Sequence, residues 1–103
     1  MTKTYDKLVR DKIPQRLKKK GLVAVTRIAE ENEYWQKLKA KLVEEVREFL
    51  KEEKKEEIVD LLEVIEAICV YKKFDKRELA GRKSEKARQR GKFRKRIILE
   101  KIG

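Results

Sequence analysis

The sequence contains no histidine, and among its 103 residues it has only one cysteine (Cys69), one serine (Ser84) and one proline. Without an imidazole the chain cannot build a Ser-His-Asp or Cys-His catalytic site, and it lacks the usual ligands of zinc and non-haem iron. A lone cysteine excludes an internal disulfide and fits a reducing compartment. Carboxylate, lysine and arginine side chains are therefore the groups left for chemistry.

Long apolar runs are also missing. No run approaches the roughly 20 residues of a membrane span, and the start of the chain, MTKTYDKLVRDKIP, lacks the apolar core of a signal peptide. We therefore expect a cytoplasmic protein without membrane contact. A length of 103 residues, with 40% of them hydrophobic, predicts one domain spanning residues 1–103.

Charge, in contrast, is abundant and unevenly distributed. Charged residues make up 48% of the chain, with a net charge of +11. Residues 44–66 oppose this balance, since ten acidic residues outnumber four basic ones, whereas residues 82–96 hold nine basic residues and one acidic residue. An acidic centre with basic ends suits a cation together with a polyanion. The same charges also fit a solvated surface, and the basic run by itself fits nucleic-acid binding.

The hydrophobic pattern predicts a mainly all-α fold. A short helix is expected from Ile13-Pro14 to about Lys20, because Pro is favoured at a helix start and Gly21 lies just beyond its end. Long helices are expected at about 32–52 and 54–73, and the polar stretch after Asp75 is a candidate fourth helix up to Arg90. The β-branched residues 23–28 and the loosely alternating residues 92–102 predict two strands paired in a short β ribbon.

Both long helices place carboxylates toward the interior. At 100° per residue, Glu45 falls inside the apolar stripe of its helix and Glu48 falls at the rim. Glu57 and Asp60 occupy the corresponding positions on the next helix. Two carboxylates about 4 Å apart repel by about 4 kcal/mol at an effective dielectric of 20, so four of them need compensating cations. Lysine or arginine partners would serve, and so would Mg²⁺, which prefers oxygen ligands and often bridges carboxylates to phosphates. Lys41, one turn before Glu45, is a candidate salt-bridge partner or phosphate contact.

The two acidic pairs, within KLVEEVREFL and EEIVDLLEVIEAI, resemble the signature of the MazG-like all-α nucleoside triphosphate pyrophosphohydrolase superfamily. YDKLVRDKIP at 5–14 and RGKFRKRIIL at 90–99 resemble the end motifs of its small branch labelled phosphoribosyl-ATP pyrophosphohydrolase-like. The resemblance covers nearly the whole chain. It implies a helical bundle completed by oligomerisation, as a homodimer or homotetramer, with the site near that interface.

The resemblance also implies an activity. This is Mg²⁺-dependent hydrolysis of a nucleotide between its α and β phosphates, with Mn²⁺ as the alternative ion, and it serves to clear unwanted nucleotides. The metal ligands and catalytic carboxylates would be Glu45, Glu48, Glu57 and Asp60, and the resemblance does not say which of them activates the water. The candidate phosphate contacts in the end motifs are Arg10, Lys12, Arg90 and Arg96, each of which could instead form a structural salt bridge.

The chain departs from the family pattern at two points. Only eight residues separate Glu48 from Glu57, which predicts a tight connection between the two helices, and Lys92 stands where the branch often has a second glycine. Tyr34, Trp35 and Phe93 are candidates either for stacking on a base or for the core. The alternative function is a basic nucleic-acid-binding module without catalysis, and a helical partner protein without a metal is a third possibility.

Overall fold

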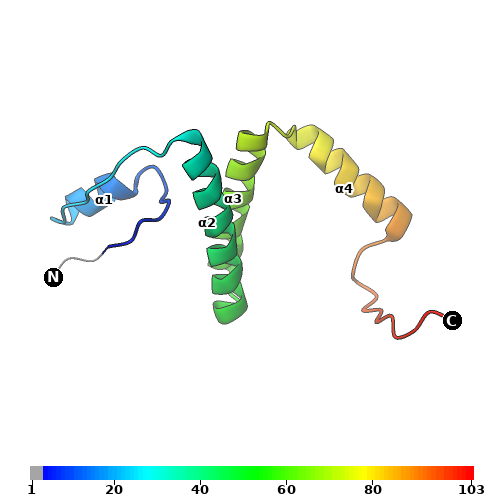
Figure 1. The fold of residues 1–103 in the computed structure, drawn as a ribbon. Helices are drawn as coiled ribbons and strands as arrows, with labels where there is room; N and C mark the ends of the chain where they lie inside the picture. Colours follow the sequence, from blue (N-terminus) through cyan, green and yellow to red (C-terminus); the bar gives the residue numbers. More distant parts are fainter. Residues whose placement is uncertain (1–3) are drawn as a thin grey trace.

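The computed structural model describes residues 4–103 as four helices: α1 (Ile13–Lys19), α2 (Glu31–Glu52), α3 (Lys55–Lys72) and α4 (Lys76–Arg90). No strand occurs within this part of the chain, which confirms the all-α prediction, and all four helices lie within a few residues of the expected ranges. In Figure 1, α2 and α3 lie side by side at the centre of the molecule. Helices α1 and α4 project to opposite sides of this pair.

Local chemistry explains where the flanking helices begin and end. Pro14 lies in the first turn of α1, where a missing N–H costs nothing, and Gly21, with a φ of 78°, follows the end of that helix. Asp75 caps α4 because its carboxylate accepts hydrogen bonds from the backbone N–H groups of Arg77 and Glu78.

The connection between α2 and α3 is as short as the sequence predicts. Only residues 53 and 54 separate the helices, and Glu53 adopts a left-handed conformation (φ 55°) while its N–H donates to the carbonyl of Phe49. This turn reverses the chain and lays α3 along α2. The carboxylates near the end of α2 therefore face those near the start of α3.

The apolar core between α2 and α3 is thin. Leu38 (1% exposed) and Val64 (7%) are the buried hydrophobic side chains within residues 4–103. The aromatic ring of Trp35 on α2 stacks on that of Tyr71 on α3, with ring centroids 5.0 Å apart and planes at 1°. Tyr34 also packs against Tyr71. Two of the three candidate base-stacking aromatics thus hold the helix pair together at the end opposite the turn.

The predicted β ribbon does not form within residues 4–103. The side chains of Val23, Val25 and Ile28 are 93–96% exposed, and Ile98 is 82% exposed. A strand needs a neighbour to accept and donate its backbone hydrogen bonds, and the two segments lie on opposite sides of the helix pair (Figure 1). The ribbon expected within one chain is therefore corrected to two separate segments without strands, and the second contains a turn in which the N–H of Arg96 donates to the carbonyl of Phe93.

The molecule is far more extended than a globular chain of its length. Its radius of gyration is 18.5 Å and its principal extents are 60 × 31 × 25 Å, whereas a compact domain of this size has a radius of gyration of about 13 Å. Within residues 4–103, no helix combines the length and the apolar character that crossing a membrane requires.

Candidate metal-binding site

Three carboxylates converge where α2 and α3 pack together near the turn. Glu45 extends from α2, and Glu57 and Asp60 extend from successive turns of α3; one oxygen of each lies within 4.8 Å of the others. Glu45 is only 8% exposed, as its position in the apolar stripe predicts, and the other two are half-buried. The residues are brought together by the helical period on each helix and by the short turn between them.

Glu48, the fourth predicted acid, lies one turn beyond Glu45 and is exposed, outside the group of three. Its charge nevertheless acts on the site. The pKa of Glu57 is raised above its ordinary value, first by partial desolvation and then by repulsion from Asp60, Glu48, Glu52 and Glu45. The ionised form of Glu57 is therefore destabilised by the concentration of negative charge at this place.

Two cations already contact the acidic group. Arg10 donates from Nη2 to Oδ1 of Asp60 at 2.9 Å, and the pair is about half exposed. Lys41 Nζ lies 3.5 Å from Oε1 of Glu45 and 3.3 Å from Oε2 of Glu44, so Lys41 is a salt-bridge partner, one of the two roles predicted for it. Four carboxylates (Glu45, Glu48, Glu57 and Asp60) against these two cations leave a local charge of −2.

Glu44 also belongs to this group of ion pairs. Helical projection places it on the outer side of α2, so the sequence pattern does not indicate it. It pairs with Lys41 and also accepts a hydrogen bond from Lys7 Nζ at 3.0 Å. Partial burial opposes ionisation of Glu44, but the hydrogen bonds and charges of Lys7 and Lys41 outweigh that effect, and the pKa of Glu44 lies below its ordinary value. The sequence feature that corresponds to this contact is the short spacing between Lys7 and Arg10. Lys7 contacts Glu44 on α2 and Arg10 contacts Asp60 on α3, so one segment joins both helices.

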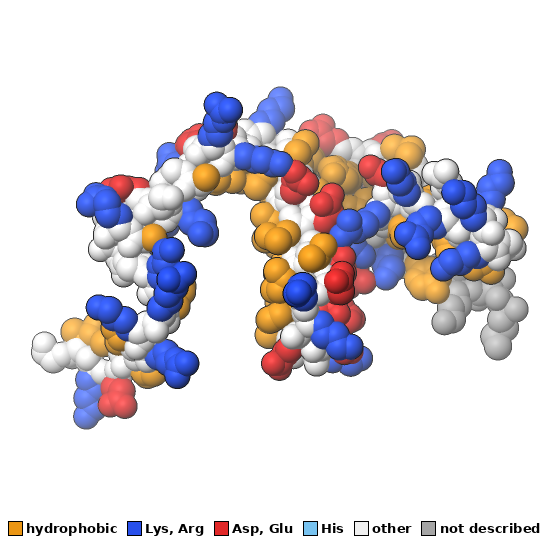
Figure 2. Space-filling view, turned by 180° about the vertical axis from the view of Figure 1, so that it is seen from behind, with side chains coloured by type: hydrophobic (Ala, Val, Ile, Leu, Met, Phe, Trp, Pro, Cys, Tyr) orange, Lys and Arg blue, Asp and Glu red, His pale blue; other side chains and the backbone are white. Residues whose placement is uncertain are grey.

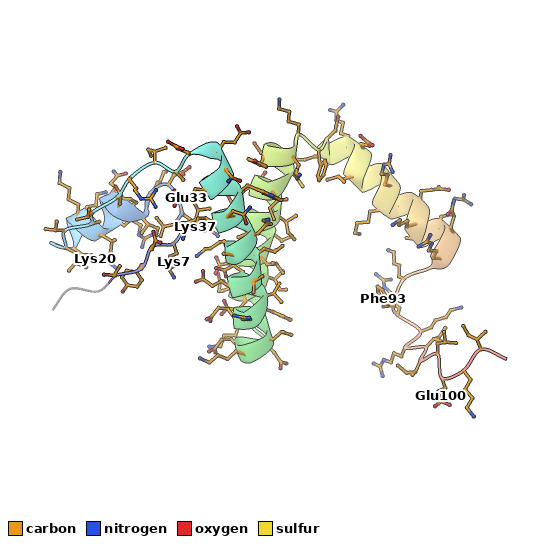
Figure 3. All side chains as sticks on the ribbon, in the orientation of Figure 1. Lys7, Lys20, Glu33, Lys37, Phe93 and Glu100 are labelled. Carbon is orange, nitrogen blue, oxygen red and sulfur yellow. The ribbon has the colours of Figure 1, made fainter. Side chains whose placement is uncertain are left out.

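The N-terminal segment is held against α2 by further ion pairs. Lys37 Nζ lies 3.3 Å from Oδ2 of Asp6, and Arg27 bridges Asp6 and Glu33. Lys7, Glu33 and Lys37 are seen together at the junction of this segment with the start of α2 (Figure 3). These contacts place Arg10 beside the acidic group from the side of the N-terminus.

The other predicted phosphate contacts lie elsewhere in this chain. Lys12 is the N-cap residue of α1, and no ion pair joins it to an acidic group within residues 4–103. Arg90 ends α4, and Arg96 lies beyond it with a φ of 57°. Because α4 points away from the α2–α3 pair (Figure 1), neither arginine reaches the acidic group of its own chain.

The charge and the apolar side chains of the helix pair lie along different edges. Figure 2 shows acidic side chains along the edge of the α2–α3 pair that faces the N-terminal segment, and hydrophobic side chains along the edge that faces α4. We call these the acidic edge and the apolar edge. Val59, Leu62 and Ile65 of α3 line a shallow groove toward the start of α4 and are 47%, 59% and 42% exposed.

The fold and the site define the chain as an all-α protein whose central antiparallel helix pair carries a carboxylate cluster flanked by basic segments. Comparison with protein-family models, with curated proteins and with solved structures gives no match. The resemblance to the MazG-like superfamily therefore stays a prediction that rests on the sequence motifs.

Proposed function

We propose that this protein is a Mg²⁺-dependent nucleotide pyrophosphohydrolase that cleaves a nucleoside triphosphate between its α and β phosphates. The products would be a nucleoside monophosphate and pyrophosphate. The proposal includes the MazG-like helical bundle as the fold, with α2 and α3 as its metal-binding helices. In this role the protein would remove unwanted nucleotides in the cytoplasm.

The observation that supports the proposal most is the convergence of Glu45, Glu57 and Asp60. Their oxygens lie within 4.8 Å of one another, and opposite oxygens around one octahedral Mg²⁺ are about 4 Å apart, so small side-chain rotations suffice. An all-oxygen donor set without histidine suits Mg²⁺ or Mn²⁺ and does not suit zinc. The residual charge of −2 at the site also matches one divalent cation. Bound there, the ion would neutralise charge on the phosphate oxygens.

The chain's own residues would then perform three tasks. Glu45, Glu57 and Asp60 hold the ion. Glu48 is solvent-accessible and close enough to influence Glu57, so it either completes the metal shell or accepts the proton of the attacking water. Arg10 is placed to leave Asp60 and contact a phosphate oxygen, because a guanidinium binds phosphate in the same fork geometry that it uses for a carboxylate.

The direct test is pyrophosphate release from a panel of standard and damaged nucleoside triphosphates, with the products resolved by mass. Glu57→Gln should abolish most Mg²⁺-dependent release, by at least about 100-fold, because loss of even an outer partner of a metal ligand costs up to that much. The neighbouring Glu56→Gln is the matched control, since Glu56 is exposed and outside the cluster. Absence of release from the whole panel with both Mg²⁺ and Mn²⁺ would refute the activity.

A second variant separates the two roles of Glu48. If Glu48 is a metal ligand, Glu48→Gln weakens Mg²⁺ binding in calorimetric titration together with turnover. If Glu48 is the general base, turnover falls while the Mg²⁺ affinity stays close to that of the wild type. The Asp60→Asn variant provides the reference for loss of a ligand.

Nucleic-acid binding without catalysis is the second candidate function, and Phe93 is the observation that favours it. This side chain is 99% exposed within a basic segment (Figure 3), and aromatic side chains among cations are typical of single-strand binding surfaces. Such binding would weaken steeply with salt and would be unchanged by Glu57→Gln. Tight binding of single-stranded DNA or RNA with that independence, and no hydrolysis, would favour this candidate.

A further inference from the structure

The C-terminal segment of the chain, residues 92–102, gathers exposed hydrophobic side chains among cations. Phe93 is 99% exposed, and exposure is also high at the aliphatic positions that follow it: 79% at Ile97, 82% at Ile98, 73% at Leu99 and 88% at Ile102. The turn between Phe93 and Arg96 lies beyond the end of α4, away from the helix pair (Figure 3). Hydrophobic side chains scattered singly are normal on a protein surface, but a group of them marks a contact surface.

The cations around this group are mostly unpaired. Residues 82–96 hold nine basic residues and one acidic residue. Two of the nine, Arg82 and Arg88, pair with glutamates of their own helix. The other seven have no ion-pair partner within residues 4–103; they are Lys83, Lys86, Arg90, Lys92, Arg94, Lys95 and Arg96. We call residues 82–102 the basic arm, and a partner that covers it must be both anionic and apolar.

The order of the hydrophobic residues favours a fluid partner. Ile97, Ile98 and Leu99 are consecutive and belong to no helix or strand in the described part of the chain, so they form no single face for a groove of fixed shape. Nucleic acid would bind the cations and stack on Phe93, but it would leave the aliphatic side chains in water. A bilayer with anionic lipids attracts lysine and arginine clusters and accepts apolar side chains at the boundary of headgroups and acyl chains.

The shape of the molecule lets the basic arm reach such a surface without the acidic edge. Helix α4 points away from the α2–α3 pair (Figure 1), and its 15 residues span about 22 Å. Basic and hydrophobic side chains are intermingled along the arm, whereas the acidic edge faces the opposite side of the helix pair (Figure 2). The Debye length is about 8 Å in physiological salt, so the acidic edge opposes the attraction only weakly.

We propose that the basic arm attaches this protein to the surface of bilayers that contain anionic lipids. Its lysine and arginine side chains bind the headgroups, and Phe93 with the aliphatic residues after the turn enters the boundary with the acyl chains. The sequence-based expectation of no membrane contact rests on the lack of a membrane-spanning run, which attachment to a surface does not require. The attachment goes beyond the proposed function, and it needs neither a metal nor the carboxylate cluster.

Flotation with lipid vesicles tests the role of the cations. The full chain, without Mg²⁺ or nucleotide, should bind phosphatidylcholine vesicles that contain about 40% phosphatidylserine and should not bind phosphatidylcholine alone. Arg94→Gln/Lys95→Gln should weaken binding at least about tenfold, because each cation near an anionic surface contributes about fivefold. Lys18→Gln/Lys19→Gln, an equal change of charge at exposed positions of α1, is the control and should have a much smaller effect. Equal effects of the two double variants would overturn the assignment to the basic arm.

A second pair of variants tests entry of the hydrophobic side chains. Ile98→Ser should weaken vesicle binding at least about threefold, whereas Ile28→Ser, at a 96% exposed position before α2, should not. Phe93→Trp in a Trp35→Phe background places the only tryptophan of the chain in the arm, and its emission should shift to shorter wavelength with the anionic vesicles. Unchanged binding by Ile98→Ser together with no emission shift would overturn the insertion and leave charge attraction alone.

Two further outcomes would overturn the proposal in favour of another partner. A wild-type chain that ignores the anionic vesicles but binds single-stranded DNA would assign the basic arm to nucleic acid. A wild-type chain that ignores both and sediments as an oligomer dispersed by Arg94→Gln/Lys95→Gln would assign it to self-association. Glu57→Gln should bind vesicles as the wild type does, so failure of attachment and failure of pyrophosphate release are separate results.

Discussion

Arg10 and Glu57 show how closely charge is balanced at the level of single side chains. Arg10 satisfies Asp60, whereas Glu57 has a raised pKa and no cation partner within residues 4–103. The acidic group is thus held by its neighbours in a partly compensated state. Removing the charge of Arg10 makes the acidic group more negative, whereas removing the charge of Glu57 makes it less negative, and both effects can be measured.

Replacing Arg10 should tighten metal binding. The guanidinium competes with a cation for Asp60, and an exposed pair of this kind contributes up to about 1 kcal/mol, so Arg10→Gln should lower the Mn²⁺ or Mg²⁺ dissociation constant about two- to fivefold. Calorimetric titration of the nucleotide-free protein measures the effect. Lys12→Gln removes the same charge two residues away and should change the affinity much less. Weaker binding in Arg10→Gln would show that Arg10 does not compete with the ion.

Replacing Glu57 should stabilise the metal-free protein near neutral pH. The pKa of Glu57 is higher in the folded chain than its ordinary value, so the folded state loses stability relative to the unfolded state as pH rises through that raised pKa. Glu57→Gln removes this loss, and its melting temperature should exceed that of the wild type at pH 7. The gain should vanish on acidification below the ordinary range for glutamate, where the wild-type carboxyl is protonated in both states. Thermal denaturation at several pH values, with Glu56→Gln as reference, measures it. A gain that does not depend on pH would contradict the electrostatic explanation.

At the scale of elements, the helices and their ends follow from the sequence while the strands do not. Periodicity, Pro14, Gly21 and the eight-residue interval between Glu48 and Glu57 were sufficient to predict four helices and a tight turn. The inward positions of Glu45 and Glu57 follow from the same periodicity. It places Asp60 and Glu48 alike at the rims of their stripes, and only Asp60 joins the group, whereas Glu48 is exposed. Strand formation in 23–28 and 92–102 depends on a neighbouring strand and on burial, which a local pattern cannot supply. The direction of α4, and hence the position of Arg90, is set at the connection after α3, where Lys73 is left-handed and Lys76 pairs with Glu66, and the hydrophobic pattern does not reveal it.

Helix α4 should be sensitive to its cap. Within residues 4–103 it has few contacts with other helices, and an isolated helix of 15 residues is marginal in water. Asp75→Ala removes the acceptor for two backbone N–H groups, costs about 0.5–2 kcal/mol, and should lower the helical circular dichroism at 222 nm. Asp75→Asn retains a capping oxygen and should keep most of the signal. Equal helicity in Asp75→Ala and the wild type would indicate that the cap does not determine the helicity of α4.

At the scale of the whole molecule, we predict that the extended shape and the thin core make stability depend on a second copy, as in the homo-oligomer expected from the sequence motifs. Leu38 and Val64 alone bury too little apolar surface to offset the chain entropy of 103 residues. The melting temperature should therefore rise with protein concentration, by about 3–6 °C for each tenfold increase, as mass action requires for a folded dimer and unfolded monomers. Scanning calorimetry over a concentration series measures this dependence. A constant melting temperature would mean that the single chain is stable by itself.

The stacking of Trp35 on Tyr71 also equips the molecule with an optical reporter. Trp35 is the only tryptophan of the chain, its ring lies flat against a residue of the facing helix, and Lys39 and Lys72 place ammonium groups 5.3 and 4.9 Å from its centre. Ten residues, or about 15 Å of helix, separate it from Glu45. Its fluorescence emission therefore records separation of α2 from α3 at a position remote from the carboxylates, so unfolding can be followed while the ion content of the solution is varied.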